Sequence, residues 1–237
     1  MNLKGKNAII TGGGRGLGKA VALLLAKEGV NIGITGRNEE NLKATVQEIK
    51  NMGVDAAYTI FSIDNEEAVK TGISNLVEQL GGVNILINNA GIGDFGSIEE
   101  MPSETWEQVI HTNLFGVYYA AKAVHPYLVE AGEGDIVNVA STAGLKGGPN
   151  MSAYAASKAA VVSLSQSMMA EWRKQNIRVV TLTPSTIASD MSIQGGLTDG
   201  NPDKVLQPED FAEWVRDILK MNRRALIANG SIFSTNP

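Results

Sequence analysis

The stretch from Asn7 to Gly18, NAIITGGGRGLG, decides how this chain folds. A short apolar run rich in β-forming residues ends at Thr11, a glycine-rich turn follows, and helical periodicity begins directly after the turn. Glycine lets the backbone turn tightly and approach an anion closely, and the first turn of a helix offers that anion free N–H groups. Strand, glycine loop and helix in this order predict a site for the pyrophosphate of a dinucleotide, rather than a purely structural turn. The residues expected to form it are Gly12, Gly14, Arg15, Gly16, Leu17 and Gly18.

The alternation of strand and helix continues along the chain. Five further apolar runs, at 30–35, 56–61, 84–88, 135–140 and 178–183, have the length and composition of buried strands. Segments with apolar residues at helical spacing separate the first of them and end at glycine. The pattern predicts an α/β fold, a Rossmann-like doubly wound parallel sheet of about seven strands with helices on both faces. We expect residues 1–237 to form a single domain, with 189–207 as a substrate loop or lid.

The composition excludes several classes of function. The chain has 237 residues, with 20 Lys and Arg against 25 Asp and Glu, and no cysteine. Disulfides, thiolate metal sites and cysteine nucleophiles are therefore excluded. The acidic balance argues against nucleic acids and anionic membranes as partners, and no stretch has the length of a membrane span or a secretory signal. We expect a cytoplasmic protein, and no metal site because His111 and His125 have no partner at ligand spacing.

The end of the second strand indicates which dinucleotide is bound. Folds of this kind that prefer NAD usually place an acidic residue there to hold the ribose 2′-hydroxyl. This chain reads Thr35-Gly36-Arg37 and has no carboxylate at the position. The planar guanidinium of Arg37, assisted by Arg15, suits a 2′-phosphate, so we predict NADP(H) as the cofactor. The alternative is that Arg37 is a solvated residue before the next helix.

Tyr154 and Lys158 form a candidate acid–base pair in the segment SAYAASKAAVVSLSQSMMAEW. Residues four apart on a helix project from one face, and Ser141 closes the strand segment before it. A tyrosine of pKa about 10 is a poor acid or base at neutral pH. An ammonium about 5 Å away contributes roughly 3 kcal/mol, or about two pKa units, toward ionising the phenol. By itself such a pair is common at protein surfaces.

Several motifs occur together in the order and at the spacing of the short-chain dehydrogenase/reductase family. They are TGGGRGLG, NNAG at 88–91, Asn113 in HTNLFG, Ser141 and YAASK at 154–158. The chain resembles this family over essentially its whole length, and within it looks most like the 3-oxoacyl-[acyl-carrier-protein] reductases and related carbonyl reductases. The resemblance implies hydride transfer to a carbonyl carbon, with the cofactor supplying the redox chemistry.

The resemblance also implies a role for each motif. Tyr154 is the proton donor or acceptor, and Ser141 hydrogen-bonds the substrate oxygen. Lys158 lowers the pKa of the tyrosine and holds the nicotinamide ribose, and Asn113 positions a water of the proton relay. Beside the adenosine side of the cofactor lie Asn89, Ala90 and Gly91.

Two segments depart from the family pattern. The family usually has Asp after the third strand to contact adenine, whereas this chain has Ser62 and Ile63 there, and we expect Asp64 to cap the next helix. After the sixth strand, Pro-Gly is replaced by Pro184-Ser185, whose backbone must tolerate a side chain. We still expect Pro184 to Ile187 to contact the nicotinamide carboxamide, with Ser189 where Thr commonly binds near it.

The substrate is left open among several classes. We expect a small ketone or a 3-oxoacyl thioester, with a sugar, polyol or diketone dehydrogenase, or a non-catalytic dinucleotide sensor, as alternatives. Reductases acting on acidic acyl carrier protein generally present basic residues just before the fifth strand, where this chain reads VEAGEGD at 129–135. An acidic rim at the active-site entrance would repel such a carrier. The other interpretation is an ordinary solvated loop away from docking.

The Tyr154 helix also bears on the oligomeric state. It carries apolar residues on more than one face, with one stripe containing Val161, Met168 and Trp172 and another containing Val162 and Met169. Family members commonly tetramerise through this helix, so we expect a homo-oligomer, either a tetramer or a dimer. The alternative is a helix buried deeply in its own domain.

Overall fold

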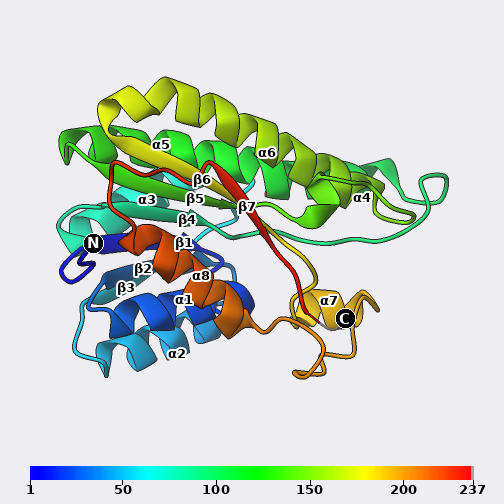
Figure 1. The fold of residues 1–237 in the computed structure, drawn as a ribbon, viewed down its shortest axis with the longest axis horizontal. Coiled ribbons are helices and arrows are strands. Elements are labelled where there is room, and N and C mark those ends of the chain that lie inside the picture. The colour runs from blue at the N-terminus through cyan, green and yellow to red at the C-terminus, as the bar shows by residue number, and fades with distance from the viewer. Residues whose placement is uncertain (236–237) are drawn as a thin grey trace.

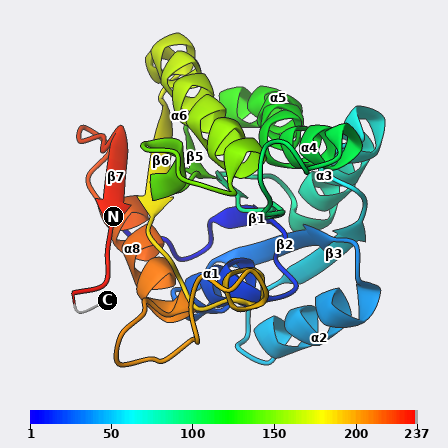
Figure 2. The same cartoon turned by 90° about the vertical axis from the view of Figure 1, so that its right-hand side faces the viewer.

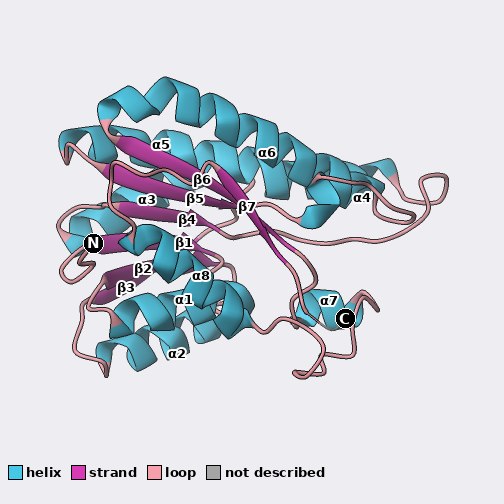
Figure 3. Cartoon of the chain, in the orientation of Figure 1, coloured by secondary structure: helices cyan, strands magenta, loops and turns pink. Residues whose placement is uncertain are grey.

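The computed structural model describes residues 1–235 and contains a seven-stranded sheet in the order β3-β2-β1-β4-β5-β6-β7 (Figures 1 and 3). Every neighbouring pair of strands runs parallel. The predicted doubly wound α/β fold is confirmed. The strands are β1 (Asn7–Thr11), β2 (Asn31–Gly36), β3 (Ala56–Ile60), β4 (Ile85–Asn88), β5 (Gly134–Val139), β6 (Ile177–Pro184) and β7 (Asn229–Ile232).

Helices cover both faces of the sheet (Figure 2). On one face α1, α2 and α8 enclose a core with Leu25, Leu42 and Phe211, and on the other α3, α5 and α6 enclose a core with Ile73, Leu128 and Met168. Within residues 1–235, every helix is too short or too polar to cross a bilayer. The helices are α1 (Gly16–Lys27), α2 (Glu39–Lys50), α3 (Glu66–Leu80), α4 (Ser103–Ile110), α5 (Gly116–Glu130), α6 (Ser152–Trp172), α7 (Asp190–Gln194) and α8 (Pro208–Lys220), with shorter turns η1 (His111–Phe115), η2 (Thr142–Gly144) and η3 (Arg173–Gln175).

Strand β1 pairs with β2 on one side and with β4 on the other, and Ile10 takes part in both pairings. The order of the strands reverses between β1 and β4. The loops that leave these two strands at their carboxyl ends therefore turn to opposite faces and open a crevice between them. The glycine loop follows β1 and the NNAG segment follows β4. The topology alone places these two sequence motifs at the same edge of the sheet.

The segment expected to be an irregular lid contains a short helix. Ser189 begins α7 with a capping box, because its hydroxyl accepts the Ser192 N–H while Ser192 Oγ accepts the Ser189 N–H. An isolated bridge between Ile187 and Leu206 closes the base of the segment. The segment 189–207 is thus a loop with two fixed ends and an ordered first turn, and α8 begins directly after it at Pro208.

The acidic segment at 129–135 lies at the amino edge of the sheet, where β5 begins, whereas Ser141 follows the carboxyl end of the same strand. Glu133 forms an ion pair with Lys6, and Asp135 forms ion pairs with Arg178 and Arg223. The carboxylates of Glu133 and Asp135 are therefore structural, and the acidic-rim interpretation is wrong for this chain because the length of β5 separates the segment from Ser141.

Candidate active site and cofactor cleft

The glycine loop is shaped for the close approach of its own ends. Gly12 and Gly16 have positive φ angles of 68° and 53°, which favour glycine. A Cβ on Gly18 would lie 2.3 Å from the Gly12 carbonyl oxygen, so no side chain fits where α1 crosses the loop. Around Gly16 a Cβ would meet no atom within 4 Å. The loop is tight on its inner side and open toward the cleft.

Thr11 ties the glycine loop to the NNAG segment. Its hydroxyl accepts the N–H groups of Asn89 and Ala90, both at 3.0 Å. The Asn89 amide donates back to the Thr11 carbonyl at 3.0 Å and to the Gly12 carbonyl at 3.3 Å. The two loops that flank the crevice are therefore one rigid unit, as a preformed ligand site requires.

The end of the cleft beside β2 is lined by Thr35, Gly36, Arg37 and Ser62, and the residues between 35 and 42 that line it include no carboxylate. Asp64 lies behind them, and its pKa is lowered by hydrogen bonds from Ser62 and then Gln108, with a smaller contribution from the charge of Arg37. Asp64 does not cap α3 as expected. Asn65 does so instead, by accepting the Ala68 N–H at 2.9 Å.

Arg15 extends from the glycine loop to the lid. Its guanidinium contacts the Asp190 carboxylate at 2.9 Å, and the two side chains are 69% and 63% exposed. An exposed ion pair of this kind contributes little to the free energy of unfolding. Arg15 is thus near the cleft as predicted, but part of its charge is directed at Asp190 in α7.

The opposite end of the cleft is formed by the last residue of β6 and the residues that follow it. Pro184, Ser185, Thr186 and Ile187 all line the cleft, and Ser185 donates its N–H to the Ile232 carbonyl at 2.9 Å. Ser185 lacks a positive φ, so its side chain is accommodated without backbone strain. Ser189 also lines the cleft, although its hydroxyl is engaged in the cap of α7.

Asn113 lies in η1, a single π-helical turn between α4 and α5, and is fully buried. Its amide accepts the Ile92 N–H at 2.8 Å and donates to the Ile92 carbonyl at 2.9 Å and to Ser157 at 3.0 Å. These bonds join the NNAG segment to the helix that carries Tyr154. The Asn113 side chain does not line the cleft, and its hydrogen bonds hold the segment after β4 against α6.

Ser141 and Tyr154 meet because η2 packs directly on α6. A Cβ on Gly144 would lie 2.6 Å from the carbonyl carbon of Lys158, so only glycine permits this approach. Ser141 begins the turn, its hydroxyl accepts the Ala143 N–H at 3.2 Å, and it lines the same cavity as Tyr154. Two residues that lie 154 − 141 = 13 positions apart in the sequence therefore line the same cleft.

Burial shifts the pKa values of the two titratable residues of α6 that line the cleft, Tyr154 and Lys158. Burial raises the pKa of Tyr154, and the hydrogen bond with Ser141 offsets part of that rise. Burial lowers the pKa of Lys158 to about 8, and its ammonium donates to the Val139 carbonyl at 2.9 Å. The Lys158 nitrogen is 5.7 Å from the Tyr154 ring centre. The spacing of the two residues in sequence shows their mutual attraction but not the cost of burying each charge. Because that cost dominates, the predicted fall in the pKa of the phenol is absent from this structure.

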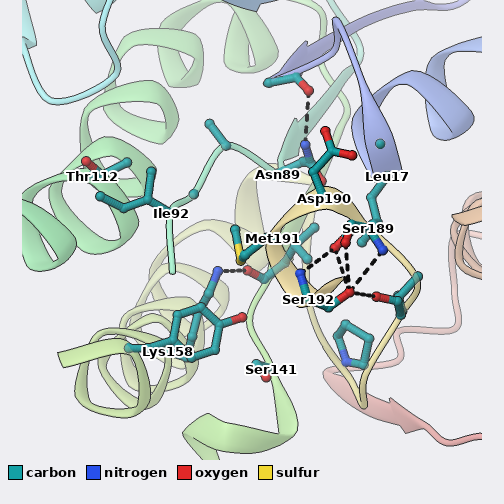
Figure 4. Close-up of a pocket in the computed structure, with 18 of the residues that line it drawn as sticks. Leu17, Asn89, Ile92, Thr112, Ser141, Lys158, Ser189, Asp190, Met191 and Ser192 are labelled. Atoms are coloured by element: carbon teal, nitrogen blue, oxygen red, sulfur yellow. Dashed lines mark hydrogen bonds between the residues drawn. The ribbon is translucent and has the colours of Figure 1, made fainter. Parts of the chain in front are cut away.

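One cavity of about 1080 Å³ joins these parts (Figure 4). In that view Ser141 and Lys158 lie on one side of it and Ser189, Asp190 and Ser192 on the other. Gly18 and Asn113 do not line it and act by packing. The other predicted site residues all line it, namely Gly12, Gly14, Arg15, Gly16, Leu17, Arg37, Ser62, Ile63, Asn89, Ala90, Gly91, Ser141, Tyr154, Lys158, Pro184 and Ile187.

The cleft fits a dinucleotide. It is open at Gly16, where a pyrophosphate needs backbone N–H groups, and long enough to run from Arg37 after β2 to Pro184 after β6. The volume lies at the upper end of the range for small-molecule sites. The glycine loop would hold the pyrophosphate, Arg37 and Ser62 the adenosine, and Lys158 with Ile187 the nicotinamide half.

A group of apolar residues that the sequence pattern does not predict lines the cleft beside Ser141 and Tyr154, at the end where a substrate would bind. These side chains are Phe95, Leu145, Met151, Met191, Leu197 and Phe233. They come from four separate loops, so no local periodicity connects them. Phe95 is the nearest to a recognisable signal, because it lies four residues beyond the NNAG motif.

Comparison with known proteins agrees with this geometry. The sequence profile of the short chain dehydrogenase family matches residues 6–198. The chain is 33% identical over 225 residues to the 3-oxoacyl-[acyl-carrier-protein] reductase of Staphylococcus aureus, covering 94% of this chain and 91% of the relative. It is 34% identical to the enzyme of the same name from Thermotoga maritima, over 81% of this chain and 78% of the relative.

Solved structures with the same fold bind either nicotinamide cofactor. An NAD⁺-bound xylitol dehydrogenase superposes with a TM-score of 0.91 at 27% identity, covering 99% of this chain and all of that one (100%). A variant of actinorhodin polyketide ketoreductase with NADPH superposes with a TM-score of 0.90 at 28% identity, covering 97% and 96%. The chain therefore belongs to the short-chain dehydrogenase/reductase family, whose members are oxidoreductases that use a nicotinamide dinucleotide.

Proposed function

We propose that the protein is an NADP(H)-dependent reductase of small ketones or 3-oxoacyl thioesters. The observation that carries the proposal is that Ser141, Tyr154 and Lys158 together line a cleft that begins at the glycine loop. When bound, the reduced nicotinamide supplies the hydride for the carbonyl carbon. The chain's own residues supply the geometry and the proton.

Tyr154 is suited to giving that proton. Because burial raises its pKa, the phenol is protonated throughout the neutral range and can act as a general acid toward a carbonyl oxygen. Ser141 hydrogen-bonds the same oxygen and Lys158 keeps a positive charge nearby below about pH 8. This protonation state favours carbonyl reduction over alcohol oxidation at neutral pH.

Replacing the phenol tests the proposal most directly. Tyr154→Phe should lower kcat/KM for ketone reduction by about 10²- to 10⁴-fold, since a positioned general acid contributes that much. The dissociation constant for NADPH, measured by fluorescence titration, should change less than about two-fold because the glycine loop is untouched. Tyr127→Phe is the matched control, because its hydroxyl bonds Ser74 far from the cleft. Tight NADPH binding by a wild type that reduces no carbonyl would favour the sensor alternative.

The preference for NADP(H) rests on Arg37. It lines the end of the cleft beside β2, where none of the lining residues that follow the strand is a carboxylate that could receive a ribose hydroxyl. Arg37→Asp should lower kcat/KM with NADPH by about 10- to 100-fold and raise it with NADH, because a bidentate guanidinium–phosphate contact is exchanged for repulsion. Arg173→Asp, the same charge change on the exposed turn η3, should leave the cofactor ratio unaltered. A wild type that prefers NADH would contradict the assignment.

The substrate end of the cleft favours ketones with an apolar group over sugars. Leu145, Leu197 and Phe233 are 57%, 45% and 61% exposed and line the mouth of the cavity. A polyol there would leave its hydroxyls without partners, which costs free energy. A polyol dehydrogenase is the second candidate, because the NAD⁺-bound structural neighbour carries that name. Assays with xylitol and NAD⁺ alongside ketones and NADPH separate the two.

We also propose a homo-oligomer. The face of α6 that the sequence analysis singled out packs largely on the chain's own core, through Val161 and Met168. The preceding helix offers better support, since Phe115 at the end of η1 and Tyr118 in the first turn of α5 are 37% and 39% exposed. A second copy would cover them. Light scattering that gives the mass of one 25.1 kDa chain would contradict this proposal.

A further inference from the structure

A second cavity of about 460 Å³ adjoins the substrate end of the cleft. Three side chains, Phe95, Met151 and Leu197, line both cavities and so form the wall between them. We call these three residues the partition. On its far side the second cavity is lined by polar groups, including Ser97, Glu100 and Asn150. The substrate end of the cleft is thus closed on this side by three apolar side chains with further space behind them.

Phe95 is the rigid member of the partition. A Cβ on Gly93 would lie 2.9 Å from Phe95 Cζ, and a Cβ on Gly195 would lie 2.8 Å from Phe95 Cε2. The ring therefore fits between two backbones that have no side chains to yield, and one of them belongs to the lid. Its other neighbour is Tyr154, with ring centres 5.7 Å apart and planes tilted by 58°. Phe95 cannot move away from the tyrosine without displacing the lid.

The loops that carry the partition are also joined. Gly96 donates its N–H to the Asn150 carbonyl at 2.9 Å, and Gly96 and Met151 form an isolated parallel bridge. Phe95 and Met151 are therefore held at one spacing by the backbone. A carbonyl placed at Ser141 and Tyr154 has this fixed wall on one flank and the open mouth at Leu145 and Phe233 on the other.

We propose that Phe95 determines substrate size, so that this enzyme takes ketones with one small group, of about methyl size, and one longer apolar group. The small group faces Phe95 and the longer group lies toward the mouth. This inference rests on the proposed ketone reduction and specifies its substrate class. Removing the Phe95 ring joins the two cavities and makes room for a larger group beside the carbonyl.

Two isomeric ketones test the proposal, because 2-octanone and 4-octanone have the same composition and differ only in where the carbonyl lies. The wild type should prefer 2-octanone in kcat/KM with NADPH by about 10-fold or more, since each methylene that a pocket rejects is worth about that factor. Phe95→Ala should reduce this preference at least about 10-fold, and Phe95→Leu should give an intermediate ratio. Ile98→Ala, 73% exposed and outside both cavities, is the control and should keep the wild-type ratio.

The outcomes separate this inference from the proposed function. If the wild type reduces 2-octanone in a Tyr154-dependent manner and both Phe95 variants keep its preference, the partition does not set substrate size. If the wild type reduces diacetyl but neither octanone, the apolar mouth does not hold a longer group and the substrate class is wrong. If no carbonyl is reduced at all, ketone reduction itself fails. Phe95→Leu keeps an apolar side chain between the two glycines, so a folding defect of Phe95→Ala alone does not remove the test.

Discussion

The two edges of the sheet bury charge in opposite ways. At the amino edge, Asp135 is 7% exposed and contacts the guanidinium groups of Arg178 at 2.5 Å and Arg223 at 3.0 Å. At the carboxyl edge, Lys158 is 5% exposed, and no carboxylate within residues 1–235 forms an ion pair with it. One edge neutralises what it buries, and the other leaves a cation with a single backbone carbonyl as its partner.

This contrast separates structure from chemistry. The amino-edge network ties together distant segments, because Arg178 also donates to the carbonyls of Leu219 and Met221 at the end of α8. An unpaired buried ammonium adds no such connection and costs free energy. Groups with strongly shifted pKa values concentrate at functional sites, and Lys158 lies beside Tyr154 in the cleft. We expect stability to reside at the first edge and activity at the second.

Breaking the amino-edge network should have the largest effect on stability. Asp135→Asn removes the charge that faces the buried guanidinium of Arg178 and the partly buried one of Arg223, and such a loss typically costs about 3 to 5 kcal/mol of unfolding free energy. Equilibrium urea unfolding measures it. Asp217→Asn is the control, because Asp217 forms an exposed pair with Arg216 and is 64% exposed. The folded fraction of Asp135→Asn should retain the wild-type kcat, and a loss of kcat without a loss of stability would refute the division between the edges.

Removing the carboxyl-edge ammonium should have the opposite sign. A pKa lowered from 10.5 to about 8 means that the folded chain binds fewer protons than the unfolded chain between those pH values. Unfolding free energy should therefore rise with pH from about 8 toward 10.5, by roughly 3 kcal/mol in total. Lys158→Met lacks this group, so it should be more stable than the wild type at pH 7 and lose that advantage as the pH rises.

The activity of the same variant completes the comparison. Lys158→Met should lose most of its ketone reduction while gaining stability, because the charge that destabilises the fold is the one beside Tyr154. Urea unfolding of both proteins at pH 7 and pH 9.5, analysed as a difference, cancels the titration of all other groups. Equal pH dependence of the two proteins would show that Lys158 does not carry an uncompensated charge.

The sequence predicts the carboxyl edge better than the amino edge. The glycine loop, NNAG and the Tyr154 helix are each contiguous in sequence, and the strand order then brings them to one crevice. The network around Asp135 joins residues up to 88 positions apart, and no local pattern announces it. The acidic segment at 129–135 was consequently assigned a possible place at the entrance. Whether a loop borders the active site depends on which end of its strand it adjoins, and the charge of the loop does not reveal this.

Within the site, the missed features are those that depend on packing. Asn113 has the position in the sequence that the family pattern predicts, but its side-chain amide is hydrogen-bonded to Ile92 and Ser157. The spacing between sequence motifs does not reveal these partners. Phe95 and the other apolar lining residues come from separate loops. The sequence pattern does not locate the last strand, β7, because it is only four residues long and its residues alternate between exposed and half-buried. Burial likewise reversed the expected direction of the Tyr154 pKa shift.

The exposed pair between Arg15 and Asp190 offers a third arrangement of charge, and its replacement should have the smallest effect. Because both side chains are largely in water, Asp190→Asn should change unfolding free energy by less than about 0.5 kcal/mol. Freed from its partner, Arg15 is available to the 2′-phosphate, so NADPH should bind a few-fold more tightly and NADH should bind as before.

Fluorescence titrations at about 0.05 and 0.5 M salt measure this difference, which should shrink at the higher salt because solvent-exposed charges are screened. Asp203→Asn removes a charge from the same lid segment that forms no ion pair within residues 1–235, and it should leave both affinities unchanged. If both dinucleotides gain equally from Asp190→Asn, the effect comes from an easier opening of the lid. If NADPH alone gains, Arg15 discriminates between the cofactors, and the lid weakens that discrimination through a single carboxylate.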